Sequence, residues 1–142
     1  MTEKEGDVLH ASCVLVGDCG VLVLGASGTG KSTLALALMG MGASLVADDR
    51  TRVWTAGGRL WAEAPATIRG RIEARGIGLL GADAVGPATV GLVVDLDRQE
   101  GERLPPMRQV EVLGVALPLV LGPLHPGLAP GVRQMALSGR LA

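Results

Sequence analysis

The chain has 142 residues, 48% of them hydrophobic, a formal net charge of −1, no Phe or Tyr, and only Trp54 and Trp61 as aromatic residues. The length predicts one domain over 1–142, and the apolar fraction excludes a disordered chain. Dispersed Lys and Arg with so few aromatic rings for base stacking argue against nucleic acid or an anionic membrane as a partner.

The N-terminal region predicts a hairpin. Residues 11–16 and the apolar run 21–24 predict two strands, joined by a turn at 17–20. Cys13 and Cys19 are too few for a disulfide framework and lack zinc-ligand companions, so we expect reduced thiols that face the interior. The polar N-terminus carries no secretory signal, and no apolar run reaches membrane-spanning length, so we expect a cytoplasmic protein.

Residues 25–32 read Gly-Ala-Ser-Gly-Thr-Gly-Lys-Ser, the pattern of a phosphate-binding loop. The apolar strand enters this loop and a run of helix formers leaves it near residue 31, which is the context that the motif requires. Glycines admit backbone N–H groups to phosphate oxygens, Lys31 can reach the outer phosphates, and the Ser32 hydroxyl can ligate Mg²⁺. The predicted nucleotide-binding residues are Gly25, Ala26, Ser27, Gly28, Thr29, Gly30, Lys31 and Ser32.

Carboxylates follow the next predicted strand, 44–47. In a parallel α/β sheet the carboxyl ends of neighbouring strands share one crevice, so Asp48 and Asp49 are expected beside the loop, one near Mg²⁺ and one facing an acceptor. The alternative for this pair is a helix cap or a surface turn. Asp95, in the apolar strand 90–97, is a rival for the metal-side acid.

The rest of the chain gives weaker signals. Residues 51–54 and 59–62 predict a hairpin, and the charged stretch 64–76 predicts at most two helical turns. Residues 98–107 predict a mobile loop, 110–121 a strand, and the chain from about 130 a short helix. Taken alone, Glu73 and Arg75 fit a solvated loop better than a site. His10 and His125 are expected to be structural.

Four segments together resemble the catalytic domain of HPr kinase/phosphorylase, the bacterial enzyme that phosphorylates a seryl residue of the phosphocarrier protein HPr. They are His10-Ala11, the loop 25–32, the segment 45–50 (Leu-Val-Ala-Asp-Asp-Arg) and the signature-like stretch 72–80 (Ile-Glu-Ala-Arg-Gly-Ile-Gly-Leu-Leu). Their order and spacing match the family from about residue 8 to residue 121.

The resemblance implies an α/β fold with a phosphate-loop core similar to the nucleotide-binding part of phosphoenolpyruvate carboxykinases, with a mixed sheet and flanking helices. It implies ATP and Mg²⁺ as cofactors, HPr or an HPr-like carrier as partner, and a homo-oligomer, since the family is typically hexameric. We expect a short form made of the catalytic domain alone. Leu128-Ala129 stand where the family carries Arg-Asn, so one arginine contact is predicted to be absent.

The resemblance also implies roles for single residues. Asp48 would activate the acceptor serine, and Arg103 matches a loop arginine that the family uses around the transferred phosphate. The implied catalytic residues are Asp48, His10, Arg75 and Arg103, and the implied metal ligands are Ser32, Glu73 and Asp49.

Three functions are compatible with this pattern. The leading hypothesis is an ATP- and Mg²⁺-dependent protein serine kinase acting on HPr, with the reverse phosphorylase reaction as a further possibility. A small-molecule kinase on the same core is the second, and a non-enzymatic nucleotide sensor is the third. The acidic residues at 48, 49 and 73 argue against the sensor, because a protein that only binds nucleotide needs no acceptor-side base.

Overall fold

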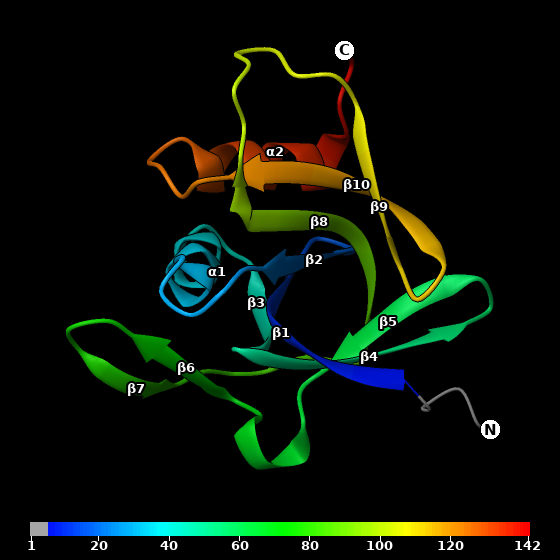
Figure 1. Cartoon of the computed structure of the whole chain (residues 1–142). Helices are drawn as coiled ribbons and strands as arrows, with labels where there is room; N and C mark the ends of the chain where they lie inside the picture. The colour runs from blue at the N-terminus through cyan, green and yellow to red at the C-terminus, as the bar shows by residue number, and fades with distance from the viewer. Residues whose placement is uncertain (1–5) are drawn as a thin grey trace.

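The computed structural model describes residues 6–142, an α/β fold whose mixed sheet is flanked by helices, as predicted (Figure 1). In chain order its elements are β1 (Gly6–Val16), β2 (Cys19–Leu24), α1 (Lys31–Gly40), β3 (Ser44–Ala47), β4 (Arg50–Ala56), β5 (Arg59–Glu63), the 3₁₀ turn η1 (Ala66–Ile68), β6 (Arg71–Ala74), β7 (Gly78–Gly81), β8 (Ala88–Gln99), β9 (Arg108–Val112), β10 (Val115–Gly122) and α2 (Leu128–Ser138). None of the helices in this described part is long and apolar enough to cross a membrane.

Strands β1 and β8 are long enough to join two sheets. The first half of β1 pairs antiparallel with β4, and its second half pairs antiparallel with β2 and β3. β8 begins antiparallel to β5 and then runs parallel to β2 and β10, while β9 continues the sheet beyond β10. The β-structure therefore closes around an interior between its sheets (Figure 1).

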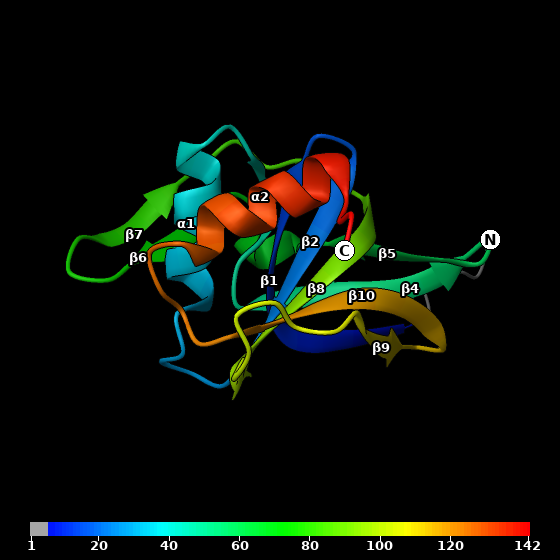
Figure 2. The same ribbon diagram turned by 90° about the horizontal axis from the view of Figure 1, so that it is seen from above.

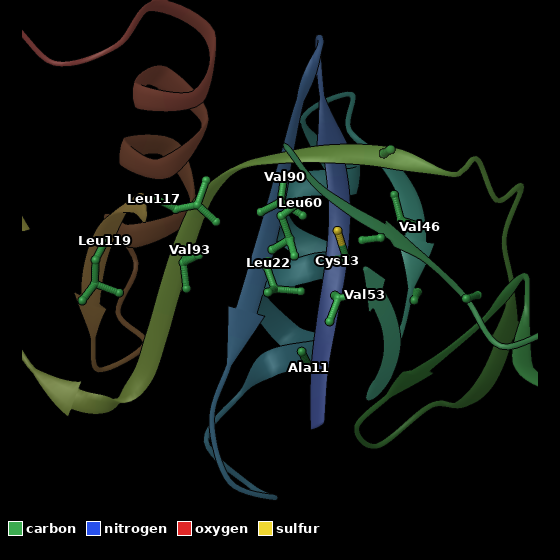
Figure 3. Packing of buried hydrophobic residues seen from close by; sticks show 14 of the residues in the cluster. Ala11, Cys13, Leu22, Val46, Val53, Leu60, Val90, Val93, Leu117 and Leu119 are labelled. Carbon is green, nitrogen blue, oxygen red and sulfur yellow. The ribbon is translucent and has the colours of Figure 1, made fainter. Parts of the chain in front are cut away.

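Two apolar clusters lie on opposite faces of the central strands. Leu22 of β2 and Val93 of β8 belong to the cluster between the sheets (Figure 3). Val23 and Val94, one position further along each strand, belong to the cluster beneath the helices α1 and α2, which lie on the same side (Figure 2). Because side chains alternate along a strand, burial on both faces requires the continuous apolar runs seen in these strands.

The carboxyl ends of β2 and β3 lie at the edge of the sheet where the predicted site residues follow these strands. We expected these strands as neighbours in a parallel sheet, but β1 lies between them and is antiparallel to both. Since both oppose β1, β2 and β3 still run in the same direction. The phosphate-loop segment and Asp48-Asp49 therefore emerge at the same edge, as predicted, through a different strand order.

Several element boundaries differ from the prediction. β1 begins at Gly6 rather than at residue 11, so that His10 lies within it. The strand character expected over 110–121 is confirmed, but a turn at Leu113 and Gly114, with φ of 48° and 80°, divides this stretch into β9 and β10. The stretch 64–76 contains one short helical turn, η1, within the limit of one or two that was predicted, and then enters the hairpin β6–β7, which was not predicted. Cys13 is buried, Cys19 is half-buried, and both are free thiols.

Candidate functional site

The loop between β2 and α1 has a backbone that only glycine adopts readily. Gly25, Gly28 and Gly30 have φ of 154°, 87° and 105°. A Cβ at Gly25 would meet Thr29 Oγ1 at 2.4 Å, so the close wrapping of the chain also excludes a side chain there. Helix α1 starts after Gly30 with no side-chain cap. Its first N–H groups are therefore free of side-chain acceptors and suited to an anion.

Lys31 holds its ammonium group inside the loop. The residue is 5% exposed, and its Nζ donates to the carbonyl oxygens of Gly25 at 2.7 Å and Ala26 at 3.3 Å. The same Nζ lies 3.8 Å from Asp49 Oδ1. A cation held this way lies where the phosphates of a nucleotide would enter the loop.

Asp48 is the centre of a hydrogen-bond cluster. It is 8% exposed, and its Oδ1 accepts from the hydroxyls of Ser12 at 2.8 Å and Ser32 at 2.6 Å. Its Oδ2 accepts the backbone N–H of Glu73 at 3.0 Å. The carboxylate thus ties strand β1, the start of α1 and strand β6 to one point, and both its oxygens are occupied.

Asp49 is placed in the opposite way. Its side chain is 55% exposed and its φ of 66° lies in the left-handed region that non-glycine residues rarely adopt. Its backbone N–H donates to Ser12 Oγ at 3.0 Å, and its carbonyl oxygen accepts the N–H of Ala11 at 3.0 Å. The backbone is held by β1 while the carboxylate remains open to solvent.

Two adjoining cavities meet at this carboxylate. A cavity of about 260 Å³ lies over the phosphate loop, and one of about 690 Å³ lies beside it under the β6–β7 hairpin. Asp49, Glu73 and Arg75 line both. Lys31 and Ser32 line only the smaller cavity, whereas Ile77 and Leu79 of the hairpin line only the larger one. The smaller cavity is therefore polar, the larger one has both polar and apolar walls, and charged side chains form the border between them.

Alternation along β6 explains how Glu73 reaches this border. Ile72 is buried in the cluster beneath α1, and Ala74 is also buried, so Arg71 and Glu73 point to the exposed face. Arg75 follows directly at the hairpin turn. Glu73 and Arg75, which taken alone fitted a solvated loop, are instead fixed on a hairpin next to the phosphate loop.

Other predicted residues lie apart from the cavities. His10 is exposed on β1, where its backbone pairs with Arg50, and it lines neither cavity. Arg103 is exposed in the β8–β9 loop and also lines neither. His125 accepts the N–H of Gly127 at Nδ1, a contact that fits the structural role expected for it.

Two acids near the end of β8 hold the backbone of the phosphate loop and of β8 itself. Asp97 Oδ1 accepts the N–H of Ala26 at 3.0 Å, and Asp95 Oδ1 accepts the N–H of Asp97 at 2.9 Å. Asp95 therefore holds the backbone of β8 at Asp97 and lines neither of the two cavities. Residues 6–142 contain no group of three His, Cys, Asp or Glu side chains that could hold a metal alone. The predicted metal set has two acids, Asp49 and Glu73, with the Ser32 hydroxyl.

Ser12 and Asp97 were missed from the sequence. Asp97 is one of several acids near the end of an apolar strand, and nothing singles it out. Ser12 gave a signal that could have been used, since it is a polar residue in the middle of an apolar strand. A buried hydroxyl in such a place requires a partner.

Comparison with known proteins agrees with this geometry. A family model described as the HPr Serine kinase C-terminal domain matches residues 4–130. The HPr kinase/phosphorylase of Caldicellulosiruptor bescii is 39% identical over 92% of this chain, and that of Brevibacillus brevis is 32% identical over 94%. The chain spans about half the length of these relatives, 47% and 48% respectively.

A solved structure extends the likeness to the fold. The Hpr(Ser) kinase/phosphatase from Coxiella burnetii matches with a TM-score of 0.78 and 28% identity, over 91% of this chain and 93% of that one. The loop, the adjacent aspartates and the β6–β7 hairpin all lie within the residues that the family model covers. The chain therefore belongs to the HPr Serine kinase C-terminal domain family.

Proposed function

We propose that this protein is an ATP- and Mg²⁺-dependent serine kinase that phosphorylates a seryl residue of HPr or an HPr-like phosphocarrier, and so regulates a phosphotransferase system. Its main structural support is that the two adjoining cavities share lining residues. A nucleotide bound by the loop would direct its terminal phosphate towards Asp49, Glu73 and Arg75, which also line the larger cavity. That space can admit an acceptor side chain from outside.

The geometry favours a different division of labour between the aspartates from the one that the resemblance implies. Asp48 is buried with both oxygens engaged by Ser12, Ser32 and the Glu73 N–H, which suits a residue that orients others. Asp49 is exposed at the border of the cavities, and its Oδ1 lies 3.8 Å from Lys31 Nζ. We therefore propose Asp49 as the carboxylate that faces the acceptor.

The donor set fits a magnesium ion. Because Ser32 donates its hydroxyl hydrogen to Asp48, the oxygen lone pairs of Ser32 remain available to a cation. Glu73 offers carboxylate oxygens in the same small cavity, with Asp49 nearby, and hard oxygen ligands completed by phosphate oxygens are what Mg²⁺ prefers. When bound, the ion would neutralise charge on the phosphates.

The proposed transfer uses few groups. Lys31 and the loop N–H groups bind the phosphates, and Asp49 takes the proton of the serine hydroxyl. The serine oxygen then bonds to the terminal phosphorus as the bond from that phosphorus to the ADP oxygen breaks. Arg75 is positioned to stabilise charge on the transferred group. His10 and Arg103 stay predicted members of the site.

The decisive experiment is the intact mass of purified HPr after incubation with this protein, ATP and Mg²⁺. We expect HPr to gain one acid-stable phosphate with wild-type protein and none with Asp49→Asn, which should still bind ATP. Asp48→Asn should also weaken transfer, but together with the Mg²⁺ dependence of ATP binding, because it loosens Ser32. Transfer by Asp49→Asn at the wild-type rate would contradict the assignment. ATP binding without transfer to HPr would favour another acceptor or a sensor.

A further inference from the structure

Ser12 occupies a position that links both aspartates. It lies in β1 with 0% exposure, on the strand between β2 and β3. Its hydroxyl donates to Asp48 Oδ1 at 2.8 Å and accepts the backbone N–H of Asp49 at 3.0 Å. A single oxygen therefore contacts the side chain of one acid and the backbone of the next.

The contact with Asp49 supports an unfavourable backbone. A left-handed φ is unfavourable for a non-glycine residue, and it persists only where neighbours hold it. At Asp49, with φ 66°, the neighbours are the Ser12 hydroxyl and the Ala11 N–H, both from β1. The direction in which the Asp49 carboxylate leaves the chain depends on this conformation.

The contact with Asp48 reaches the metal side of the site. Ser12 and Ser32 donate to the same oxygen of Asp48, so the serine on β1 fixes the carboxylate that in turn orients the Ser32 hydroxyl. Removing the Ser12 hydroxyl leaves the buried Oδ1 with one donor instead of two. It also leaves the Asp49 N–H without its acceptor.

We infer that Ser12 is a positioning residue, which sets the direction of the Asp49 carboxylate through the Asp49 backbone and holds the Ser32 hydroxyl through Asp48. This inference rests on the proposed kinase function for its effect on transfer. It predicts a coordinated defect, in which phosphoryl transfer and the Mg²⁺ dependence of ATP binding fall together while metal-free ATP binding is kept. A hydroxyl that only stabilised the core would produce no such pattern.

The test compares Ser12→Ala with Thr51→Val. Thr51 is also 0% exposed, and its hydroxyl donates to the carbonyl oxygen of Ala11 at 2.8 Å, so it is a neighbouring buried hydroxyl that touches neither aspartate. For each variant, urea unfolding gives stability, calorimetry gives ATP affinity with Mg²⁺ and with EDTA, and intact mass gives kcat on HPr. If Ser12→Ala folds poorly, Ser12→Cys removes the hydroxyl while nearly keeping the volume of the side chain. Ser12→Thr is the conservative variant, because it keeps a hydroxyl at this position.

We expect Ser12→Ala to lower kcat about 10- to 100-fold, the usual effect of a lost orienting partner, and to reduce the affinity gained from Mg²⁺. ATP affinity in EDTA should stay within about twofold of wild type, Ser12→Thr should recover transfer, and Thr51→Val should lose stability only. A Ser12→Ala protein with the wild-type kcat and Mg²⁺ response overturns the inference, as does an equal loss in both variants. If wild-type protein transfers nothing to HPr, the kinase proposal fails, and the Mg²⁺ response still tests the role of Ser12.

Discussion

Cys13 shows how burial changes the chemistry of one side chain. It lies in the apolar cluster between the sheets, and burial, with a smaller contribution from nearby Cys19, raises the pKa of its thiol to about 12 from an ordinary 9.0 (Figure 3). Between these pH values the unfolded chain has lost the thiol proton and the folded protein keeps it. By linkage, stability that is present below the lower value is lost as the pH rises towards the higher one.

This gives a pH-dependent prediction for stability. Within that window each pH unit should lower the unfolding free energy of wild type by about 1.4 kcal/mol more than that of Cys13→Ala, which has no thiol there. Urea unfolding of both proteins, below and within the window, measures the difference. Parallel stability curves for the two proteins would show that the thiol ionises as readily in the folded state as in the unfolded one.

At the scale of an element, the β8–β9 loop is closed by a charged pair at its base. Arg108 donates from Nε and a terminal nitrogen to the two carboxylate oxygens of Glu100, both at 2.9 Å. Hydrogen bonding from Arg108 lowers the pKa of Glu100. The pair therefore stabilises the fold fully at a pH above the ordinary carboxyl pKa, and this stabilisation is lost as the pH falls through the lowered value. Arg140 also donates to the carbonyl oxygens of Pro105 and Pro106.

Arg108→Ala should therefore loosen the loop that carries Arg103. We expect lower protection of the amides over 100–107 in this variant, measured as exchange relative to the intrinsic rate at the same pH. Wild type should show the same loss of protection at low pH, with protection in β8 and β10 unaffected. Arg103→Ala is the matched control, because it removes a cation from the same loop and should lower transfer without changing exchange. Unchanged exchange in Arg108→Ala would mean that the loop is held by its other contacts.

The elements differ in how far the sequence could reveal them. The hairpin of β4 and β5 was predicted because Gly57 and Gly58 both adopt positive φ, at 61° and 76°, as such a turn demands. The β9–β10 turn uses Leu113 at φ 48°, a conformation that a leucine in an apolar run does not announce. The first half of β1 was missed because its mostly exposed residues carry little apolar signal.

The candidate site also has a part that the sequence could predict and a part that it could not. The phosphate loop could be predicted because its residues are contiguous and its glycines and Lys31 have fixed tasks. The contact of Ser12 with Asp48 joins residues 36 positions apart, so it depends on the strand order β2–β1–β3, which local patterns do not give. The exposure of Asp49 and burial of Asp48 depend on the same order, and adjacent aspartates look alike in a sequence.

At the scale of the whole molecule, the proposed nucleotide site gathers segments from distant parts of the chain. The loop follows β2, the aspartates follow β3, and Glu73 comes from β6. Ser12 of β1 contacts both aspartates. A ligand bound there contacts the folded arrangement and finds no counterpart in the unfolded chain. Its binding free energy should therefore appear in the free energy of unfolding.

Magnesium ATP at 100 times its Kd should raise the unfolding free energy by about 2.7 kcal/mol, the amount that mass action gives for one site. Lys31→Ala should bind ATP at least about tenfold more weakly and so lose about half of this increase or more at the same ligand concentration. Lys31 is 5% exposed with Nζ directed to the loop carbonyls, and a charged pair with phosphate is a strong one. Arg59→Ala removes an exposed cation beyond both cavities and should keep the full increase. Urea unfolding with and without ligand measures all three proteins, and a Lys31→Ala protein stabilised as much as wild type would refute the assignment of the loop as the nucleotide site.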